Sequence, residues 1–523
     1  MKNIYSFLLL LITLATNAQV FKRSELPTTL TTPWEITYGP DGFLWISEDG
    51  GTVSRVDPSN GNKTKVYTAP DYFAGSVLEQ SPLCFKPVIG AGTLGLALHP
   101  DFMDTASSYI YYVYSYNSGS TQAPATKFKL KRLKWDAAAK SVVADSDLVT
   151  MISSGYDHLG GRLMAIKQNN ISHIFLSIGD HGASETNSPD CYSPQSANPN
   201  NFAQDPNTQN GKIHRFNMDG SIPSDNPISG NSFYTRGHRN PQGLMYNPNL
   251  DIIYDIEHGD RTDDEINILH KGMNYGWKYV RGYHADNNYP GEANYIKNYV
   301  PDKNIANDSL VEAFYSFCAT PQDTAANYLD WCTVAPSDGL YYGSAGIPAW
   351  TNSLLLVTLK DGASTDMQVY QFKLRSDGKL DSSTASNPNP KKYFAADQKQ
   401  NGRLRDIAVS PDGKKIYLIN NFGANKDKIT VYAYDSLASG LADIVIADDI
   451  NIYPNPANDV LKINVSDNDI RIQKIVIYNM LGQVINIENK NNLSINISNF
   501  FKGFYTIEII TNNGSCAKKF LKE

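Results

Sequence analysis

Short apolar runs separated by polar turns recur from about residue 30 to residue 435. Each copy has a Pro-Asp or Pro-Asn turn, an apolar strand, a polar loop and a second strand. Convincing amphipathic helices are scarce, so the pattern indicates an all-β chain. The clearest strands are expected at residues 43–46, 53–56, 109–113, 174–180, 212–216, 252–254, 354–357, 369–372 and 416–419.

The copies are irregularly spaced, and we count roughly six of them. A recurring unit of turn, strand, turn and strand with long insertions is typical of a β-propeller. The sequence therefore predicts a six-bladed β-propeller over residues 25–438. Because a propeller gathers loops from every blade around one mouth, residues far apart in sequence are expected to share a single pocket.

The pattern changes near residue 440, where the chain becomes rich in Asn and Ile. Alternating strands are expected at residues 460–465, 475–478 and 505–510, with a hairpin-like turn at 480–483. We predict a small separate β-sandwich over residues 448–523, with a carbohydrate-binding or adhesion module as the alternative use of such a fold.

Composition narrows the function classes. The chain has 523 residues, a formal net charge of −7 and 19% charged residues. Without a long Lys/Arg block, this balance does not suggest a nucleic-acid binder. Lys2, the apolar run 7–14 and the small residues 16–18 indicate a signal peptide over 1–18. The alternative, a membrane anchor, needs a longer run, and no later segment is long enough to span a bilayer.

Export permits disulfides among the five cysteines. Cys318 and Cys332 are near in sequence and can close a short loop. Cys84 and Cys191 can pair, which the sequence leaves open, and Cys516 is a candidate free thiol. No CxxC metal pattern is present.

Three local clusters carry candidate chemistry. The first is Asp157-His158, where a histidine is suited to act as a general base near neutral pH. Asp180 is a candidate partner that would hold the ring in one tautomer. The alternative is an ordinary hydrogen-bonded loop histidine, and the competitors for the base are His99, His173, His181, His238 and His258.

The second cluster is Arg239-Asn240, a fork of donors suited to an anionic ligand. Arg403 and Arg405 alternate before a strand, so both are expected on one face, which is unfavourable without an anion between them. With Lys360 they form a possible socket for a polyanion. The alternatives are a structural arginine and a solvated strand edge.

The third cluster is the acidic run of residues 263–265, preceded by Gly259 and Asp260. Its carboxylates can ligate calcium or face solvent, and taken alone the run is expected to face solvent. The spacing does not match an EF-hand. Backbone carbonyls of Gly259 and Asp260 would also suit a hard cation.

These stretches resemble the soluble, pyrroloquinoline quinone (PQQ)-dependent glucose/sorbosone dehydrogenase family, whose fold is a six-bladed propeller. The resemblance covers most of the chain from about 30 to 435. It rests on residues 157–163, 177–182, 211–223, 237–243, 263–267, 274–277, 331–337 and 403–406.

The resemblance implies a role for each residue. His158 matches the base that takes the proton from the sugar C1 hydroxyl, Asp180 the carboxylate that orients it, and Asp157 its neighbour. Arg239 matches the residue beside the reactive quinone oxygens. The matched positions for binding the cofactor are Arg239, Asn240, Lys360, Arg403, Arg405, Trp331 and Tyr328, and those for the cofactor-linked calcium are the carbonyls of Gly259 and Asp260.

Three departures from the glucose enzymes leave the sugar open. The stretch 90–95 lacks their pocket Gln, Asp260 stands where they have Pro, and Cys332 follows Trp331 where they have Cys before Trp. The implied activity is oxidation of an aldose to a lactone, with electrons passing to an external acceptor. The alternatives are a calcium-dependent lactonase, which needs carboxylates converging on the central channel, and a non-catalytic binding propeller.

The tail resembles the C-terminal sorting domain of the type IX secretion system. Its opening Tyr-Pro-Asn-Pro at residues 453–456 and the Leu-Gly-Gln turn at 481–483 carry the likeness. The resemblance implies a secreted or cell-surface protein that engages the type IX machinery.

Overall fold

The fold is known from a computed structural model. The structure describes residues 21–75, 91–121, 124–155, 157–181, 201–286, 289–318, 331–360, 366–384, 388–423, 426–434, 450–465, 471–479, 484–489, 493–511 and 514–523. Its contacts divide the chain into two compact units, one of residues Arg23–Tyr432 and one that contains residues Ala433–Glu523. The signal-peptide prediction, the turn at 480–483 and the pair Cys84 and Cys191 lie outside the described residues.

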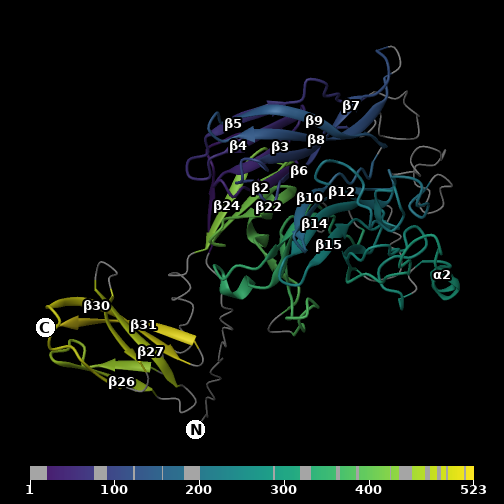
Figure 1. Ribbon diagram of the computed structural model, residues 1–523. Coiled ribbons are helices and arrows are strands. Elements are labelled where there is room, and N and C mark those ends of the chain that lie inside the picture. Colours follow the sequence, from purple (N-terminus) through teal and green to yellow (C-terminus); the bar gives the residue numbers. More distant parts are fainter. Residues whose placement is uncertain are drawn as a thin grey trace, which may run out of the picture. The chain divides into compact units, whose positions relative to one another are not determined.

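The described residues of the larger unit form six four-stranded sheets (Figure 1). The first three are β2 (Glu35–Tyr38), β3 (Leu44–Glu48), β4 (Thr52–Val56) and β5 (Lys63–Thr68); β6 (Thr93–Leu98), β7 (Tyr109–Asn117), β8 (Thr126–Asp136) and β9 (Ser141–Ile152); and β10 (Leu163–Gln168), β11 (Ile171–Ile178), β12 (Lys212–Asn217) and β13 (Phe233–Arg236).

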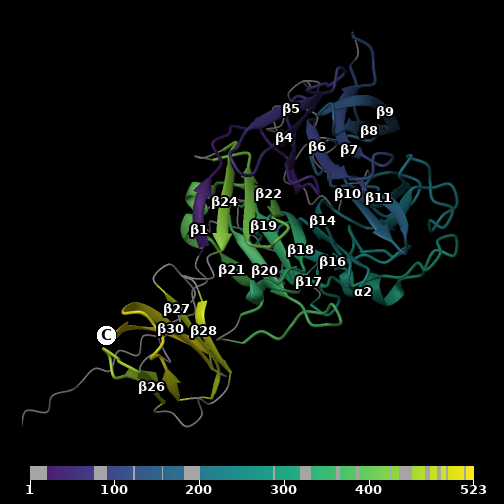
Figure 2. The ribbon, with the colours of Figure 1, turned by 60° about the vertical axis from the view of Figure 1, so that its left-hand side comes forward.

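The next two sheets are β14 (Pro241–Asn247), β15 (Ile252–Glu257), β16 (Asp264–Ile268) and β17 (Tyr315–Phe317); and β18 (Pro336–Tyr342), β19 (Ser353–Thr358), β20 (Val369–Lys373) and β21 (Lys391–Tyr393). The last sheet contains β22 (Leu404–Val409), β23 (Lys415–Asn420) and β24 (Ile429–Tyr434), and its fourth strand is β1 (Phe21–Glu25). The first strand of the described chain thus completes a sheet made by the last strands of the unit (Figure 2).

The first strands of the six sheets contact one another in closed cyclic order, β2 to β6, β10, β14, β18, β22 and back to β2. In β14, β18 and β22 the register shifts near the first residue, at Gln242, Ser337 and Arg405. Such bulges re-aim a side chain that a regular strand would send elsewhere. The starts of these strands therefore bring polar side chains from several sheets together.

The prediction of an all-β chain is confirmed, and each of the expected strands coincides with an observed one. Helix is confined to short segments, α2 (Glu292–Asn298), α3 (Gln398–Asn401), η3 (Pro348–Trp350) and η4 (Ala395–Asp397), in the described part of the chain. Among those residues no helix is long and apolar enough to cross a membrane.

The C-terminal unit has two sheets. One contains β25 (Ile450–Tyr453), β26 (Val460–Val465) and β29 (Ser494–Asn496), and the other contains β27 (Ile472–Asn479), β28 (Val484–Asn489), β30 (Gly503–Thr511) and β31 (Gly514–Lys522). One apolar core, with Leu461 and Ile463 from the first sheet and Ile475 and Ile507 from the second, lies between them. Cys516 is buried in this core and forms no disulfide among the described residues.

Candidate active site

A histidine and a carboxylate meet at the ends of neighbouring segments of one sheet. His158 precedes β10, and Asp180 follows β11 by two residues. His158 Nδ1 lies 2.7 Å from Asp180 Oδ1, and both residues are buried. Since an ionised carboxylate only accepts hydrogen bonds, this contact places the ring proton on Nδ1 and leaves Nε2 as the acceptor.

The second oxygen of Asp180 has its own donors. Asn201 Nδ2 donates to Asp180 Oδ2 at 3.0 Å, and Trp277 Nε1 donates to the same oxygen at 2.8 Å. The backbone N–H of Asp180 donates to the carbonyl of Arg239 at 2.8 Å. A carboxylate with several donors can stay ionised in a site without solvent.

Close backbone packing places the pair. A Cβ at Gly179 would lie 2.0 Å from the carbonyl oxygen of His158 and 3.0 Å from that of Arg239, so only glycine fits there. His158 itself has a φ of 48°, and the side chain of Asp157 accepts a hydrogen bond from the His158 backbone N–H at 3.0 Å. Asp157 therefore holds the loop that carries His158.

The competing histidines have structural partners. Burial lowers the pKa of His181 to about 4, and its Nδ1 lies 3.0 Å from Asn210 Nδ2. Burial and the charge of Arg239 lower the pKa of His258 to about 3. Burial alone would lower the pKa of His238, but Glu257 and Asp255 raise it to about 9.

The last two competing histidines are His99, which directly follows β6, and His173. His99 Nδ1 accepts a hydrogen bond from the backbone N–H of Asp101 at 3.0 Å, and His173 is buried within β11. Among the candidate histidines, His158 is the one that contacts the carboxylate expected to orient it.

Arg239 and Asn240 lie next to this pair, immediately before β14. The Arg239 backbone N–H donates to Glu257 Oε2 at 2.8 Å, and its Nη1 donates to the carbonyl of His258 at 3.1 Å. Asn240 Oδ1 accepts from Gln242 Nε2 at 2.8 Å, and Asn240 Nδ2 lies 3.4 Å from His258 Nδ1. Hydrogen bonds with Glu257, His258 and Gln242 thus fix the orientations of Arg239 and Asn240.

Arg405 is buried and forms no ion pair among the described residues, although Asp406 and Asp338 oppose part of the fall in its pKa. Its Nη2 donates to Gln242 Oε1 at 3.0 Å, its guanidinium lies 4.4 Å from the ring centre of Trp34, and its Nε has no hydrogen-bond partner. Burial together with the charges of Arg162 and Arg403 lowers its pKa to about 9. The solvated-edge alternative is wrong for Arg405, because the bulge in β22 turns it inward.

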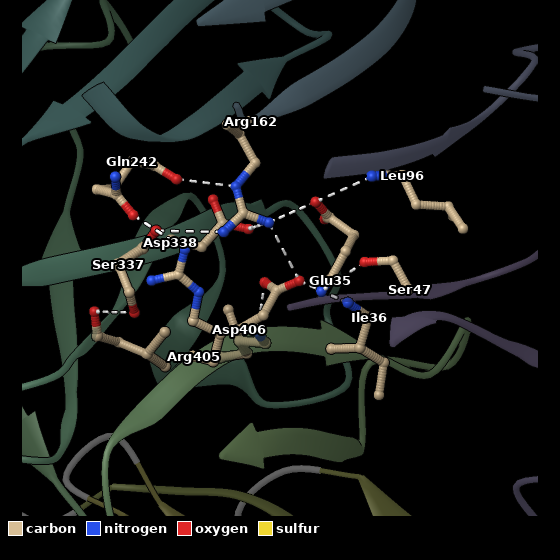
Figure 3. A network of polar contacts seen from close by, with 12 residues as sticks. Glu35, Ile36, Ser47, Leu96, Arg162, Gln242, Ser337, Asp338, Arg405 and Asp406 are labelled. Carbon is tan, nitrogen blue, oxygen red and sulfur yellow. Dashed lines mark hydrogen bonds and ion pairs between the residues drawn. The ribbon is translucent and has the colours of Figure 1, made fainter. Parts of the chain in front are cut away.

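A carboxylate cluster lies beside Arg405 (Figure 3). Arg162 Nη1 lies 2.5 Å from Glu35 Oε2, 3.0 Å from Asp338 Oδ2 and 3.4 Å from Asp406 Oδ2. These are the converging acids that a calcium lactonase would need, but the Arg162 guanidinium contacts all three. Their attraction raises the pKa of this arginine against the effect of burial.

Lys360, which follows β19, and Trp331, which precedes β18, are hydrogen-bonded to each other. Lys360 Nζ donates to the carbonyl of Trp331, and the Trp331 ring lies 4.9 Å from the Arg261 guanidinium. The adjacent Cys332 forms a disulfide with Cys318, a pairing that the short spacing allowed. Tyr328 lies outside the described residues. Arg403 packs near Phe422 at 5.9 Å and contributes to the positive field at Arg405.

The acidic run does not face solvent, so that expectation is wrong. Asp263, Asp264 and Glu265 are all buried. Asp264 accepts backbone N–H groups of Gly259, Val334 and Ala335 at 2.6–2.9 Å, and Glu265 accepts that of Gly282 at 2.5 Å. These carboxylates hold the loop in shape rather than meeting water.

Asp260 is engaged by arginines. Its Oδ2 lies 3.1 Å from Arg281 Nη2, and its Oδ1 lies 4.0 Å from Arg239 Nη2. A small cavity here is lined by Arg239, Glu257, His258, Gly259, Asp263, Glu265, Trp277 and Arg281, among others. The Gly259–Asp260 loop therefore lies against the same arginine as the histidine pair.

Sequence reasoning assigned no role to Asn201, Trp277, Gln242 and Arg281. Gln242 and Trp277 lie in the stretches 237–243 and 274–277 that carry the family resemblance. Their polar side-chain atoms were the one sequence feature that could have indicated a role in the site. Asn201 and Arg281 gave no signal, because their contacts depend on segments distant in the chain.

Comparison with known proteins identifies the family to which the chain belongs. The sequence profile described as glucose/sorbosone dehydrogenase matches residues 30–429. The chain belongs to this family. A second profile, the secretion system C-terminal sorting domain, matches residues 451–523 and indicates secretion or a cell-surface location.

Characterised relatives agree with the family. The chain is 29% identical to quinoprotein glucose dehydrogenase B of Acinetobacter calcoaceticus, over 78% of this chain and 87% of that protein. It is 27% identical to an aldose sugar dehydrogenase of Escherichia coli, over 73% and 85%. Quinoprotein sugar dehydrogenases are thus the chain's relatives.

Solved structures share the fold. The apo-form of the soluble aldose sugar dehydrogenase from Escherichia coli has a TM-score of 0.56 at 22% identity, covering 80% of this chain and all of that one. The PQQ-bound aldose sugar dehydrogenase from Streptomyces coelicolor has a TM-score of 0.53 at 20% identity, covering 79% and 98%.

Proposed function

We propose that this family member is a secreted aldose dehydrogenase that uses PQQ and calcium to oxidise the C1 hydroxyl of a sugar to a lactone. The observation that carries the proposal is the His158–Asp180 pair, 2.7 Å apart, which is joined to Arg239 by the hydrogen bond from the Asp180 backbone N–H to the Arg239 carbonyl at 2.8 Å. A base with a free Nε2 beside a fixed guanidinium suits proton removal with charge stabilisation.

The chain's own residues supply the acid–base part. His158 Nε2 accepts the proton of the C1 hydroxyl while Asp180 holds Nδ1–H and stabilises the resulting imidazolium. Arg239 offers donors to negative charge that develops on the acceptor. When bound, PQQ would supply the two-electron acceptor for the C1 hydrogen and its electron pair.

The donor set fits a polyanionic cofactor. Arg405 is buried beside Arg403 and carries an unpartnered Nε, which makes it a ready donor to a carboxylate. Asn240 and Lys360 would be further donors, and Trp331 and Tyr328 would cover the ligand. Gln242 holds Arg405 and Asn240 in position.

Calcium would bind at the carbonyl oxygens of Gly259 and Asp260, as the family resemblance implies. A hard cation suits oxygen ligands in an irregular loop. The loop is held by Asp264, whose side chain accepts the Gly259 N–H at 2.9 Å.

We also infer a six-bladed propeller and a small C-terminal β-sandwich as the two domains, over 25–438 and 448–523. The six sheets with cyclic contacts between their first strands support the former, and two sheets around one core support the latter. The sorting-domain match supports export by the type IX machinery, and we infer from the N-terminal sequence that residues 1–18 are a signal peptide. Electrons would pass to an external acceptor.

The decisive experiment is a dye-reduction assay on the purified chain. The apo-protein is reconstituted with PQQ and calcium, separately and together, and tested against a panel of aldoses. Activity that needs both additions supports the proposal. No activity with any aldose, together with no PQQ binding in an absorbance titration, would refute it.

A further inference from the structure

The carboxylate that orients the base is itself held by two donors from separate segments. Asn201 reaches it from the segment before β12, and Trp277 reaches it from the segment after β16. Both donate to Asp180 Oδ2, at 3.0 and 2.8 Å, while Oδ1 faces His158. We propose that Asn201 and Trp277 are positioning residues for His158, an assignment that rests on the proposed function.

We call Asn201 and Trp277 the clamp, because both bind Asp180 Oδ2 and leave Oδ1 to contact His158. With Oδ2 occupied from two directions, the carboxylate plane cannot turn, and Oδ1 stays aimed at His158 Nδ1. Asp180 has no exposed surface, so no solvent replaces a lost donor. The two donors to Oδ2 therefore keep Oδ1 aimed at the ring and keep the proton of His158 on Nδ1, which leaves Nε2 free as the base.

The two donors are tied to each other. Gln204 donates to the carbonyl oxygen of Trp277 at 2.6 Å, and it exchanges hydrogen bonds with the amide of Asn274 at 2.9 and 2.7 Å. The Gly237 N–H donates to the Ala203 carbonyl at 3.1 Å. Movement of the segment that carries Asn201 would thus move the segment that carries Trp277, so the two donors keep one fixed geometry around Asp180.

Trp277 also links the base to the arginines. Its ring centre lies 5.6 Å from the Arg239 guanidinium and 5.1 Å from that of Arg281, within cation–π range. Its backbone N–H donates to the Gly237 carbonyl at 3.0 Å, two residues before Arg239. One indole therefore sets the position of the proton acceptor relative to Arg239.

The test compares Trp277→Phe and Asn201→Ala with the wild-type full chain. Trp277→Phe removes the N–H and keeps an aromatic face for the arginines. Trp135→Phe, which changes a buried indole in β8 packed on Trp45, is the matched control. Outer partners of this kind typically contribute 10–100-fold, so kcat should fall by about that factor, while the sugar KM and the PQQ Kd change less than about threefold.

A spectroscopic readout separates positioning from general damage. In the apo-protein with ¹⁵N-labelled histidine, assigned with His158→Gln, the wild type should show Nδ1–H at His158. Both clamp variants should show a mixture of tautomers, and Trp135→Phe should not. An unchanged tautomer in both clamp variants would overturn the proposal.

A double variant provides a second criterion. If Trp277 acts through Asp180, Trp277→Phe should cost little further activity in an Asp180→Asn background, since residues acting as a unit are not additive. A full additional loss would contradict the assignment. Because the tautomer is read without sugar or cofactor, an inactive wild type would refute the proposed function and leave the clamp result standing.

Discussion

Arg405→Met should make the apo-protein more stable and at the same time weaken PQQ binding. In the described structure this guanidinium is buried beside Arg162 and Arg403, with its Nε unpartnered. A buried cation without a matching anion destabilises the fold, and a bound polyanion would remove that cost. Methionine fills a similar volume without charge.

The structure gives the magnitude. The pKa of Arg405 falls from 12.5 to about 9 through burial and the two neighbouring arginines, so its charged form costs about 5 kcal/mol at about 1.4 kcal/mol per pKa unit. Loss of the Gln242 hydrogen bond and of the Trp34 contact offsets about 2–3 kcal/mol. The net gain of about 2–3 kcal/mol raises Tm by about 2–4 °C in a unit of about 400 residues.

Thermal unfolding with and without PQQ is the assay, run at fixed pH and calcium. Wild type should gain Tm on adding PQQ, and Arg405→Met should start higher and gain little. The control is Arg236→Met, which breaks a buried pair with Asp308 at 2.8 Å and should lower Tm at either condition. A less stable apo Arg405→Met that keeps the full PQQ shift would refute the reasoning.

Three further outcomes follow from the site and its supports. His158→Ala should abolish sugar oxidation and leave PQQ binding by absorbance titration nearly unchanged; equal activity would exclude this residue as the base. Gly179→Ala should prevent assembly of the site, because its Cβ would lie 2.0 Å from the His158 carbonyl; near wild-type kcat and Tm would contradict that packing. The double variant Cys318→Ser, Cys332→Ser should lose about 3 kcal/mol of unfolding free energy and bind PQQ more weakly, since Cys332 anchors Trp331; unchanged denaturant midpoints and affinity would refute this.

Local patterns accounted for much of the fold. Apolar alternation in segments such as 109–113 and 354–357 depends on neighbours in the chain, so β7 and β19 were predictable from sequence. The short spacing of Cys318 and Cys332 allowed their disulfide without deciding it. The burial of Asp264 was not predictable, because its partners at Val334 and Ala335 are 70 and 71 residues away.

For the candidate site, the sequence by itself supplied the chemical groups and the strand-bounded loops that carry them. Motifs around His158 and Arg239, with the family resemblance, named a base and an anion-binding group. Only the tertiary structure decided which atoms meet: Trp277 reaches Asp180 across 97 residues, and a bulge turns Arg405 inward. The reason is physical. Alternation of apolar and polar residues sets the local strand, whereas the partners of a buried polar atom are set by the packing of sheets against one another.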